Sequence, residues 1–121
     1  MPNHPLLSLV SDLRAFAVIR TETAEQAAAA GMACLRGGVR LLEITLTVPD
    51  ALEAVEKLAG EEGAVVGVGS IVSPDQVRRA AAAGARFAVS PHFDPDVLAE
   101  AKSRGMMSSM GGVTHIRREL N

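Results

Sequence analysis

The chain has 121 residues, enough for one domain (residues 1–121) with a modest hydrophobic core. Apolar residues make up 48% of it and charged residues 21%, a balance typical of folded globular proteins. With 12 basic and 14 acidic residues, a net charge of -2 and no basic cluster, the composition argues against nucleic acid or an anionic membrane surface as a partner.

The sequence shows neither a membrane-targeting segment nor a set of cysteines that could form disulfides. No apolar run approaches the roughly 18 residues of a membrane span, and the first residues lack the basic start and apolar core of a signal peptide. The single cysteine, Cys34, can build neither a disulfide framework nor a zinc site, and its helical surroundings indicate a small core residue. We therefore expect a cytoplasmic protein without a metal ion.

The predicted elements alternate between short apolar strands and helices of about ten residues. In chain order they are a strand at 16–19, a helix at 24–35, a strand at 39–44, a helix at 49–58, a strand at 64–66, a helix at 75–83, a strand at 87–89, a helix at 96–104 and a strand from 106 onward. Thr23, Ser73 and Asp94 are suitable N-cap residues. Glycines follow the predicted helices at 37–38, 84 and 105, where a left-handed backbone is common.

This alternation predicts right-handed β-α-β units and a parallel sheet, in the α/β class. The strands are apolar almost throughout, as expected when both faces of a sheet are covered. Two architectures fit: an open doubly wound sheet, or part of a (β/α)8 barrel of the TIM type. No strand is followed by the Gly-x-Gly-x-x-Gly fingerprint, which weakens the case for a dinucleotide-binding fold.

Polar and glycine-rich segments follow the predicted strands at one end only. They are Arg20-Thr21, the run 43–47, the run 67–70 and Ser90-Pro91-His92. In both architectures functional residues gather where parallel strands end. The carboxyl edge of the sheet is therefore the predicted site.

Glu43 interrupts the apolar run 41–44, and a carboxylate inside a buried strand is costly unless it is paired or used. One interpretation is a structural ion pair with Arg20 or Arg40. The other is a general acid/base whose pKa is raised by apolar surroundings. Both interpretations are open at this stage.

The neighbouring candidates have similar alternatives. Arg20 could clamp a carboxylate or phosphate through its guanidinium, or be a solvated strand-end arginine. The Ser70 hydroxyl and the N–H groups around it could hold an anion, or Ser70 could be an ordinary turn residue. His92 could face the same edge, but the simpler interpretation is a solvated loop histidine.

Four segments together resemble the KDPG/KHG aldolase family. They are AVIR (17–20), GGVRLLEITL (37–46), VGVGS (66–70) and AGARFAVSP (83–91). The resemblance spans about residues 16–105 and implies a (β/α)8 barrel, usually a homotrimer, that needs no metal or organic cofactor. It also implies a class I aldolase that cleaves 2-dehydro-3-deoxy-6-phosphogluconate or 4-hydroxy-2-oxoglutarate through a Schiff base.

By the same resemblance, Glu43 is the catalytic proton shuttle. The implied substrate-binding residues are Arg20, Thr45, Thr47, Gly69, Ser70, Ser90 and Pro91. Arg20 would replace an arginine that many family members have just after the Glu-x-Thr-Leu segment, where this chain has Thr47. Ser70 replaces the family's usual threonine and keeps the hydroxyl.

The family's Schiff-base lysine lies on the sixth strand, and a barrel needs at least about 200 residues. We therefore expect this chain to be the N-terminal part of a barrel, with about five βα units, truncated after about residue 105 or altered near its end, which is a short polar segment at 113–121. Its two lysines, Lys57 and Lys102, fall in predicted helices, where an amine stays protonated and is a poor nucleophile. The cut sheet is expected to associate with further copies.

Three functions remain open from the sequence. The chain is a lyase of the aldolase type acting on a 2-oxo acid or phosphorylated sugar acid; or a non-catalytic half-barrel that binds such a molecule; or a module that assembles with other copies and binds nothing small. Cleavage by the 121 residues alone is expected to be weak or absent.

Overall fold

The computed structural model describes residues 4–111. Its elements are α1 (Leu6–Leu13), β1 (Phe16–Ile19), α2 (Ala24–Arg36), β2 (Leu41–Thr45), α3 (Ala51–Ala59), β3 (Val65–Gly69), α4 (Pro74–Ala82), β4 (Phe87–Ser90), α5 (Pro95–Ser103) and β5 (Met107–Met110). The polar ending at 113–121 lies outside the described residues. Within the described part, no helix is long and apolar enough to cross a membrane.

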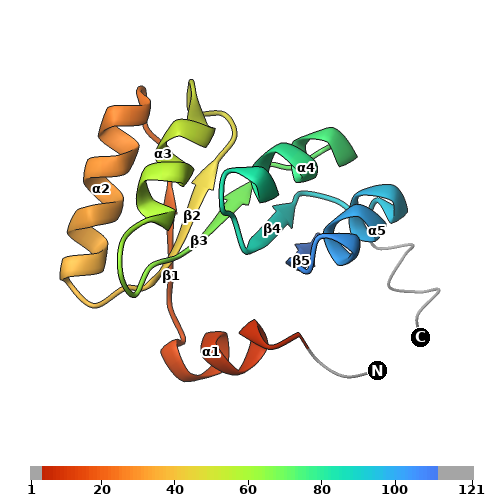
Figure 1. The fold of residues 1–121 in the computed structure, drawn as a ribbon, viewed down its shortest axis with the longest axis horizontal. Coiled ribbons are helices and arrows are strands. Elements are labelled where there is room, and N and C mark those ends of the chain that lie inside the picture. Colours follow the sequence, from red (N-terminus) through yellow and green to blue (C-terminus); the bar gives the residue numbers. More distant parts are fainter. Residues whose placement is uncertain (1–3, 112–121) are drawn as a thin grey trace.

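The five strands form one parallel sheet in the sequential order β1-β2-β3-β4-β5, which confirms the predicted βα units (Figure 1). A doubly wound sheet reverses its strand order and carries helices on both faces. Here the order never reverses, and α2, α3, α4 and α5 all cover one face of the curved sheet. The arrangement is therefore that of a barrel opened along one side.

The predicted helix caps form as expected. The Thr23 hydroxyl accepts the Gln26 N–H at 3.1 Å, Ser73 accepts the Gln76 N–H at 3.3 Å, and Asp94 accepts the Asp96 N–H at 2.9 Å. Past α2 the left-handed residue is Gly38, with φ of 97°. Each cap ends the preceding loop and fixes where the next helix starts against the sheet.

The outer face of the sheet holds the main core. Alternate strand residues such as Leu42, Ile44, Val66 and Val68 point outward and pack against the alanine-rich faces of the helices. Val55 and Leu58 of α3 are fully buried there. Because strand side chains alternate between faces, this packing also decides which residues point into the open barrel.

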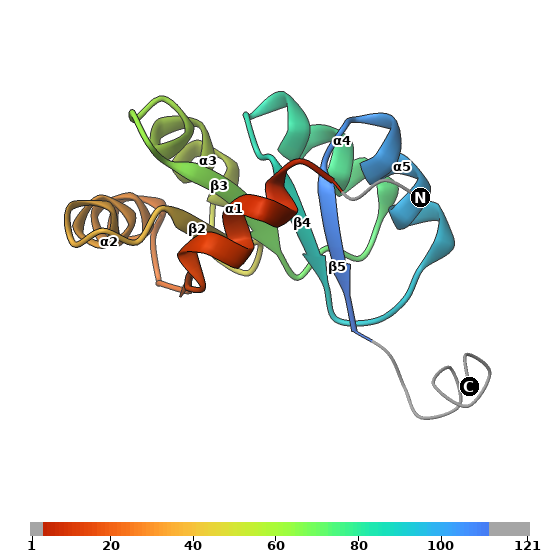
Figure 2. The ribbon, with the colours of Figure 1, turned by 90° about the horizontal axis from the view of Figure 1, so that it is seen from below.

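Helix α1 was not expected from the sequence. It crosses the inner, concave face at the amino-terminal ends of the strands, where its Leu6 packs with Leu41, Val65 and Phe87 (Figure 2). The His4 imidazole lies 2.7 Å from the Gly105 carbonyl, so the first turn is also tied to the loop before β5. The helix closes the end of the half-barrel opposite the predicted site.

The boundaries differ from the predictions mainly at β2 and β3. β2 starts at Leu41, two residues later than expected, and β3 continues through Gly69. The two glycines of β3 pair with β2 in register, Glu43 beside Gly67 and Thr45 beside Gly69. Cross-strand hydrogen bonding overrides the weak strand propensity of glycine.

Candidate functional site

Backbone hydrogen bonds join the carboxyl ends of four strands into one edge. The Leu46 N–H donates to the Gly69 carbonyl at 3.0 Å, the Ile71 N–H to Val89 at 3.1 Å and the Gly111 N–H to Ser90 at 3.0 Å. The residues predicted from the strand ends therefore lie along one rim.

Glu43 sits in the middle of β2 and points into the open barrel, where its side chain leans over Gly69 of the next strand. Only 9% of the residue is exposed. Burial raises the pKa of its carboxyl above the ordinary value, and the charge of Arg20 partly opposes this. A raised pKa brings this carboxyl closer to the range in which a side chain can both take up and release a proton, as a general acid/base must.

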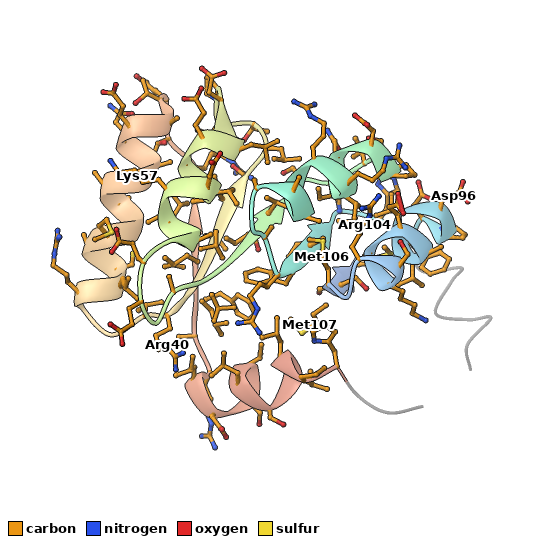
Figure 3. All side chains as sticks on the ribbon, in the orientation of Figure 1. Arg40, Lys57, Asp96, Arg104, Met106 and Met107 are labelled. Carbon is orange, nitrogen blue, oxygen red and sulfur yellow. The ribbon has the colours of Figure 1, made fainter. Side chains whose placement is uncertain are left out.

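The structural ion pair considered for Glu43 does not form. Among the ion pairs of residues 4–111, none includes Glu43. Arg40 lies at the other end of β2, near α1, and its Nε donates to the Gly63 carbonyl at 2.7 Å (Figure 3). Arg20 acts on Glu43 through its charge, from an exposed position just past β1.

Thr45 and Thr47 form a hydroxyl pair at the end of β2. Their Oγ1 atoms are 2.9 Å apart, and Thr45 Oγ1 also lies 3.5 Å from the Ile19 carbonyl at the end of β1. Thr45 is buried, whereas Thr47 is exposed. Thr45 therefore ties the two strand ends together and holds Thr47 at the rim.

Ser70 follows β3 in a left-handed backbone conformation, with φ of 63°. Few residues other than glycine adopt this conformation, and such outliers cluster at functional sites. The turn places a half-buried Ser70 at the rim directly after buried Gly69.

Ser90 and Pro91 are placed differently from each other. Ser90 is buried, and its hydroxyl has no hydrogen-bond partner within the described residues. By strand alternation it follows Ala88 toward the helices, whereas Phe87 and Val89 line the inside. Pro91 and His92 are exposed at the rim.

Below Glu43 a groove of about 250 Å³ follows the inner face of the sheet. Sequence reasoning did not name its walls, which include Phe16, Val18, Phe87, Met107 and Ser109. The Phe16 and Phe87 rings meet edge to face, with centroids 5.4 Å apart. Alternation along β2 shows only that Leu41 and Thr45 face the same side as Glu43. Finding the groove walls on the other strands requires the register between strands.

Neither lysine approaches Glu43. Lys57 lies on the outer helix layer, in a shallow hollow between α2 and α3 (Figure 3). Lys102, in the last turn of α5, borders a hollow with His4, Gly105 and Met106, at the amino-terminal end of β5. Both side chains are exposed.

A sequentially ordered parallel sheet with outer helices and a buried carboxyl near its carboxyl edge is the design of (β/α)-barrel enzymes. The sequence comparison is more specific: residues 7–118 match the family described as KDPG and KHG aldolase. The chain belongs to this family, whose members are class I aldolases.

Curated relatives agree with this assignment. The 2-dehydro-3-deoxy-phosphogluconate aldolase of Treponema pallidum is 32% identical over 111 residues, covering 89% of this chain and 53% of the relative. The KHG/KDPG aldolase of Escherichia coli K12 is 34% identical over 100 residues, covering 82% and 46%. The chain thus spans about half the length of the curated relatives it matches.

Solved aldolase structures also match over about half of their length. The KDPG aldolase of Legionella pneumophila, solved with pyruvate captured as a covalent carbinolamine, superposes with a TM-score of 0.73 at 30% identity, covering 87% of this chain and 51% of that one. A 4-hydroxy-2-oxoglutarate/2-deydro-3-deoxyphosphogluconate aldolase from TTHB1 gives 0.72 at 31% identity, covering 94% and 57%. These matches confirm the TIM-barrel fold class, with five βα units present here.

Proposed function

We propose that this chain carries the proton-transfer and anion-binding half of a class I aldolase site. The substrate is a 2-oxo acid, such as a 2-dehydro-3-deoxy-6-phospho sugar acid or 4-hydroxy-2-oxoglutarate, and the products are pyruvate and an aldehyde. The observation that carries the proposal is the half-barrel's one inward-pointing carboxyl among the described residues, Glu43, with its raised pKa.

In this role Glu43 moves a proton to and from the carbon next to the substrate ketone. The exposed guanidinium of Arg20 binds the substrate carboxylate, because a fork of N–H donors fits a carboxylate in two-point contact. Thr45 and Thr47 offer hydroxyl donors at the same rim, and the left-handed turn at Ser70 presents its hydroxyl to an anionic group. Gly69, Ser90 and Pro91 complete the proposed rim around the substrate, Ser90 through its backbone because its side chain faces the helices.

Cleavage of the carbon–carbon bond needs an uncharged amine beside the substrate carbonyl, because the protonated imine accepts the electrons of the breaking bond. Lys57 and Lys102 are exposed on the outer helices, so neither supplies that amine beside Glu43. In this proposal the amine comes from outside the 121 residues. Alone, the chain is expected to exchange protons without cleaving.

The test follows the methyl protons of pyruvate in heavy water by NMR. The chain should accelerate their exchange relative to Glu43→Gln, and a positioned acid/base contributes roughly 100- to 10,000-fold. The same samples are treated with borohydride and pyruvate and examined by mass spectrometry, with no covalent adduct expected. Rapid cleavage of 2-dehydro-3-deoxy-6-phosphogluconate with an adduct on Lys57 or Lys102 would overturn the assignment of the amine.

The remote positions of both lysines also favour a second function, a half-barrel that binds a phosphorylated or oxo acid without turning it over. This function predicts thermal stabilisation by such an acid, lost in Arg20→Met, with exchange no faster than in Glu43→Gln. If the acid gives neither exchange nor stabilisation, the assembly module expected from the open sheet becomes the better description.

A further inference from the structure

The inner face of β3 is nearly bare, because two of its three inward positions are glycines. Val65, Gly67 and Gly69 alternate along it, all buried. Gly67 is the register partner of Glu43 on one side and of Phe87 on the other. Two large side chains from the flanking strands therefore compete for the space above one strand.

The structure separates these two side chains along the strand. A Cβ atom built on Gly67 would collide with the Phe87 ring, so the ring occupies the space above Gly67. A Cβ atom built on Gly69 would collide with Oε2 of Glu43 and lie 2.9 Å from its Cδ. Glu43 thus leans toward the carboxyl edge, away from its own register partner.

We propose that Gly69 is a positioning residue for Glu43: its missing side chain forms the seat that holds the carboxylate at the carboxyl edge, and Phe87 above Gly67 blocks the alternative seat. This assigns Gly69 a steric role distinct from the substrate-binding role that the resemblance implies. Its catalytic consequence rests on the proton-transfer function proposed above, whereas the seat itself does not.

Alanine at position 69 is a clean test of the seat. Gly69 is not among the glycines with positive φ, so alanine meets no backbone strain there. The atoms it would strike are the end of a flexible side chain, which can move. Alanine at Gly67 would instead strike the ring of Phe87, a core residue that is 1% exposed, and disturb folding.

The groove is where we expect the displaced carboxylate to move. The Phe87 ring occupies the space toward the amino-terminal end, and Glu43 already lines the groove, whose Phe16 and Val18 are exposed to solvent. Hydration there favours the charged form, so the pKa of Glu43 should fall toward its ordinary value of 4.5.

The experiment titrates Glu43 by carbon NMR in the 121-residue chain, using Glu43→Gln to assign its signal. Gly69→Ala should lower the pKa of Glu43, whereas Gly60→Ala should leave it unchanged, because a Cβ there meets only ordinary contacts, 3.6 Å from the Lys57 carbonyl. An unchanged pKa in Gly69→Ala overturns the proposal.

A double-mutant comparison distinguishes a clash with Glu43 from a general folding defect in Gly69→Ala. Any loss of melting temperature caused by Gly69→Ala should vanish in a Glu43→Ala background, where nothing occupies the seat. An equal loss in both backgrounds would overturn the proposal, because it would place the clash elsewhere.

Pyruvate exchange is measured on the same variants, and a slower rate in Gly69→Ala links the seat to proton transfer. If wild type and Glu43→Gln exchange equally, the proposed function fails while the titration still decides the role of Gly69.

Discussion

Arg20 follows the end of β1, Glu43 lies in the neighbouring strand β2, and the charge of Arg20 acts on the Glu43 carboxyl without an ion pair between them. Burial raises the pKa of the Glu43 carboxyl, and the positive charge of Arg20 pulls it back down. Arg20 is exposed while Glu43 is buried, so the charge of the arginine acts on the carboxyl from a solvated position.

Replacing Arg20 with methionine should therefore raise the pKa of Glu43 further, because burial is then unopposed. Added salt should raise it in the wild type in the same direction by screening an exposed charge. NMR titration of Glu43 measures both effects. Arg36→Met, at the far end of α2, is the control and should leave the titration unchanged; a pKa that falls in Arg20→Met would contradict this account.

Glu43→Gln should stabilise the fold at neutral pH. A carboxyl whose folded pKa is raised binds its proton more tightly in the folded state, so its contribution to stability is present below the unfolded pKa and is lost as pH rises through the folded pKa. Glutamine does not titrate, so the Glu43→Gln protein does not lose this stability as the pH rises. Urea unfolding across acid and neutral pH should show the two proteins diverging as pH rises, and Glu56→Gln, exposed on α3, should show no such divergence.

Ser90→Ala should keep or increase stability, by up to about 1 kcal/mol, because the lost hydroxyl is buried with no partner among residues 4–111. Ser103→Ala is the matched control: its hydroxyl donates to the Glu100 carbonyl at 2.8 Å, so its loss should destabilise slightly. Chemical denaturation measures both. A clear loss of stability in Ser90→Ala would mean that the hydroxyl has a partner in solution.

Gly31→Ala should destabilise the chain by about 1–3 kcal/mol through overpacking. Gly31 is buried in α2, and a Cβ there would lie 2.5 Å from Leu58 Cδ1 of α3. The cost should shrink in a Leu58→Ala background, where the space is free. Equal costs in both backgrounds would show that α2 and α3 do not approach as closely as described.

The chain should self-associate through its open side. β1 and β5 are edge strands, and the inner residues Phe16 and Val18 remain 40% and 60% exposed. Sedimentation at tens of micromolar protein should detect dimers or larger species, and Val18→Lys should weaken them by charging the edge. A well-folded monomer for the unmodified chain would contradict this prediction.

The sequence by itself determined the elements from β1 onward, the α/β class and the edge of the sheet at which the candidate residues lie. Helix caps such as Thr23 and Ser73 depend on contacts within a few residues, so their pattern is visible along the chain. The site edge was equally predictable, because parallel strands joined by helices must all end on the same side. The unusual position of Glu43 followed from one charge in an apolar strand.

Only the tertiary structure showed which residues of neighbouring strands lie beside one another and which face of the sheet each one occupies. The inward neighbours of Glu43 come from β1, β3, β4 and β5, and only cross-strand pairing shows that Gly69 lies beneath the carboxylate while the Phe87 ring lies over Gly67. The distance of Arg40 from the site and the closure of the far end by α1 were likewise set by packing. These contacts join residues far apart in sequence, and no local pattern encodes them.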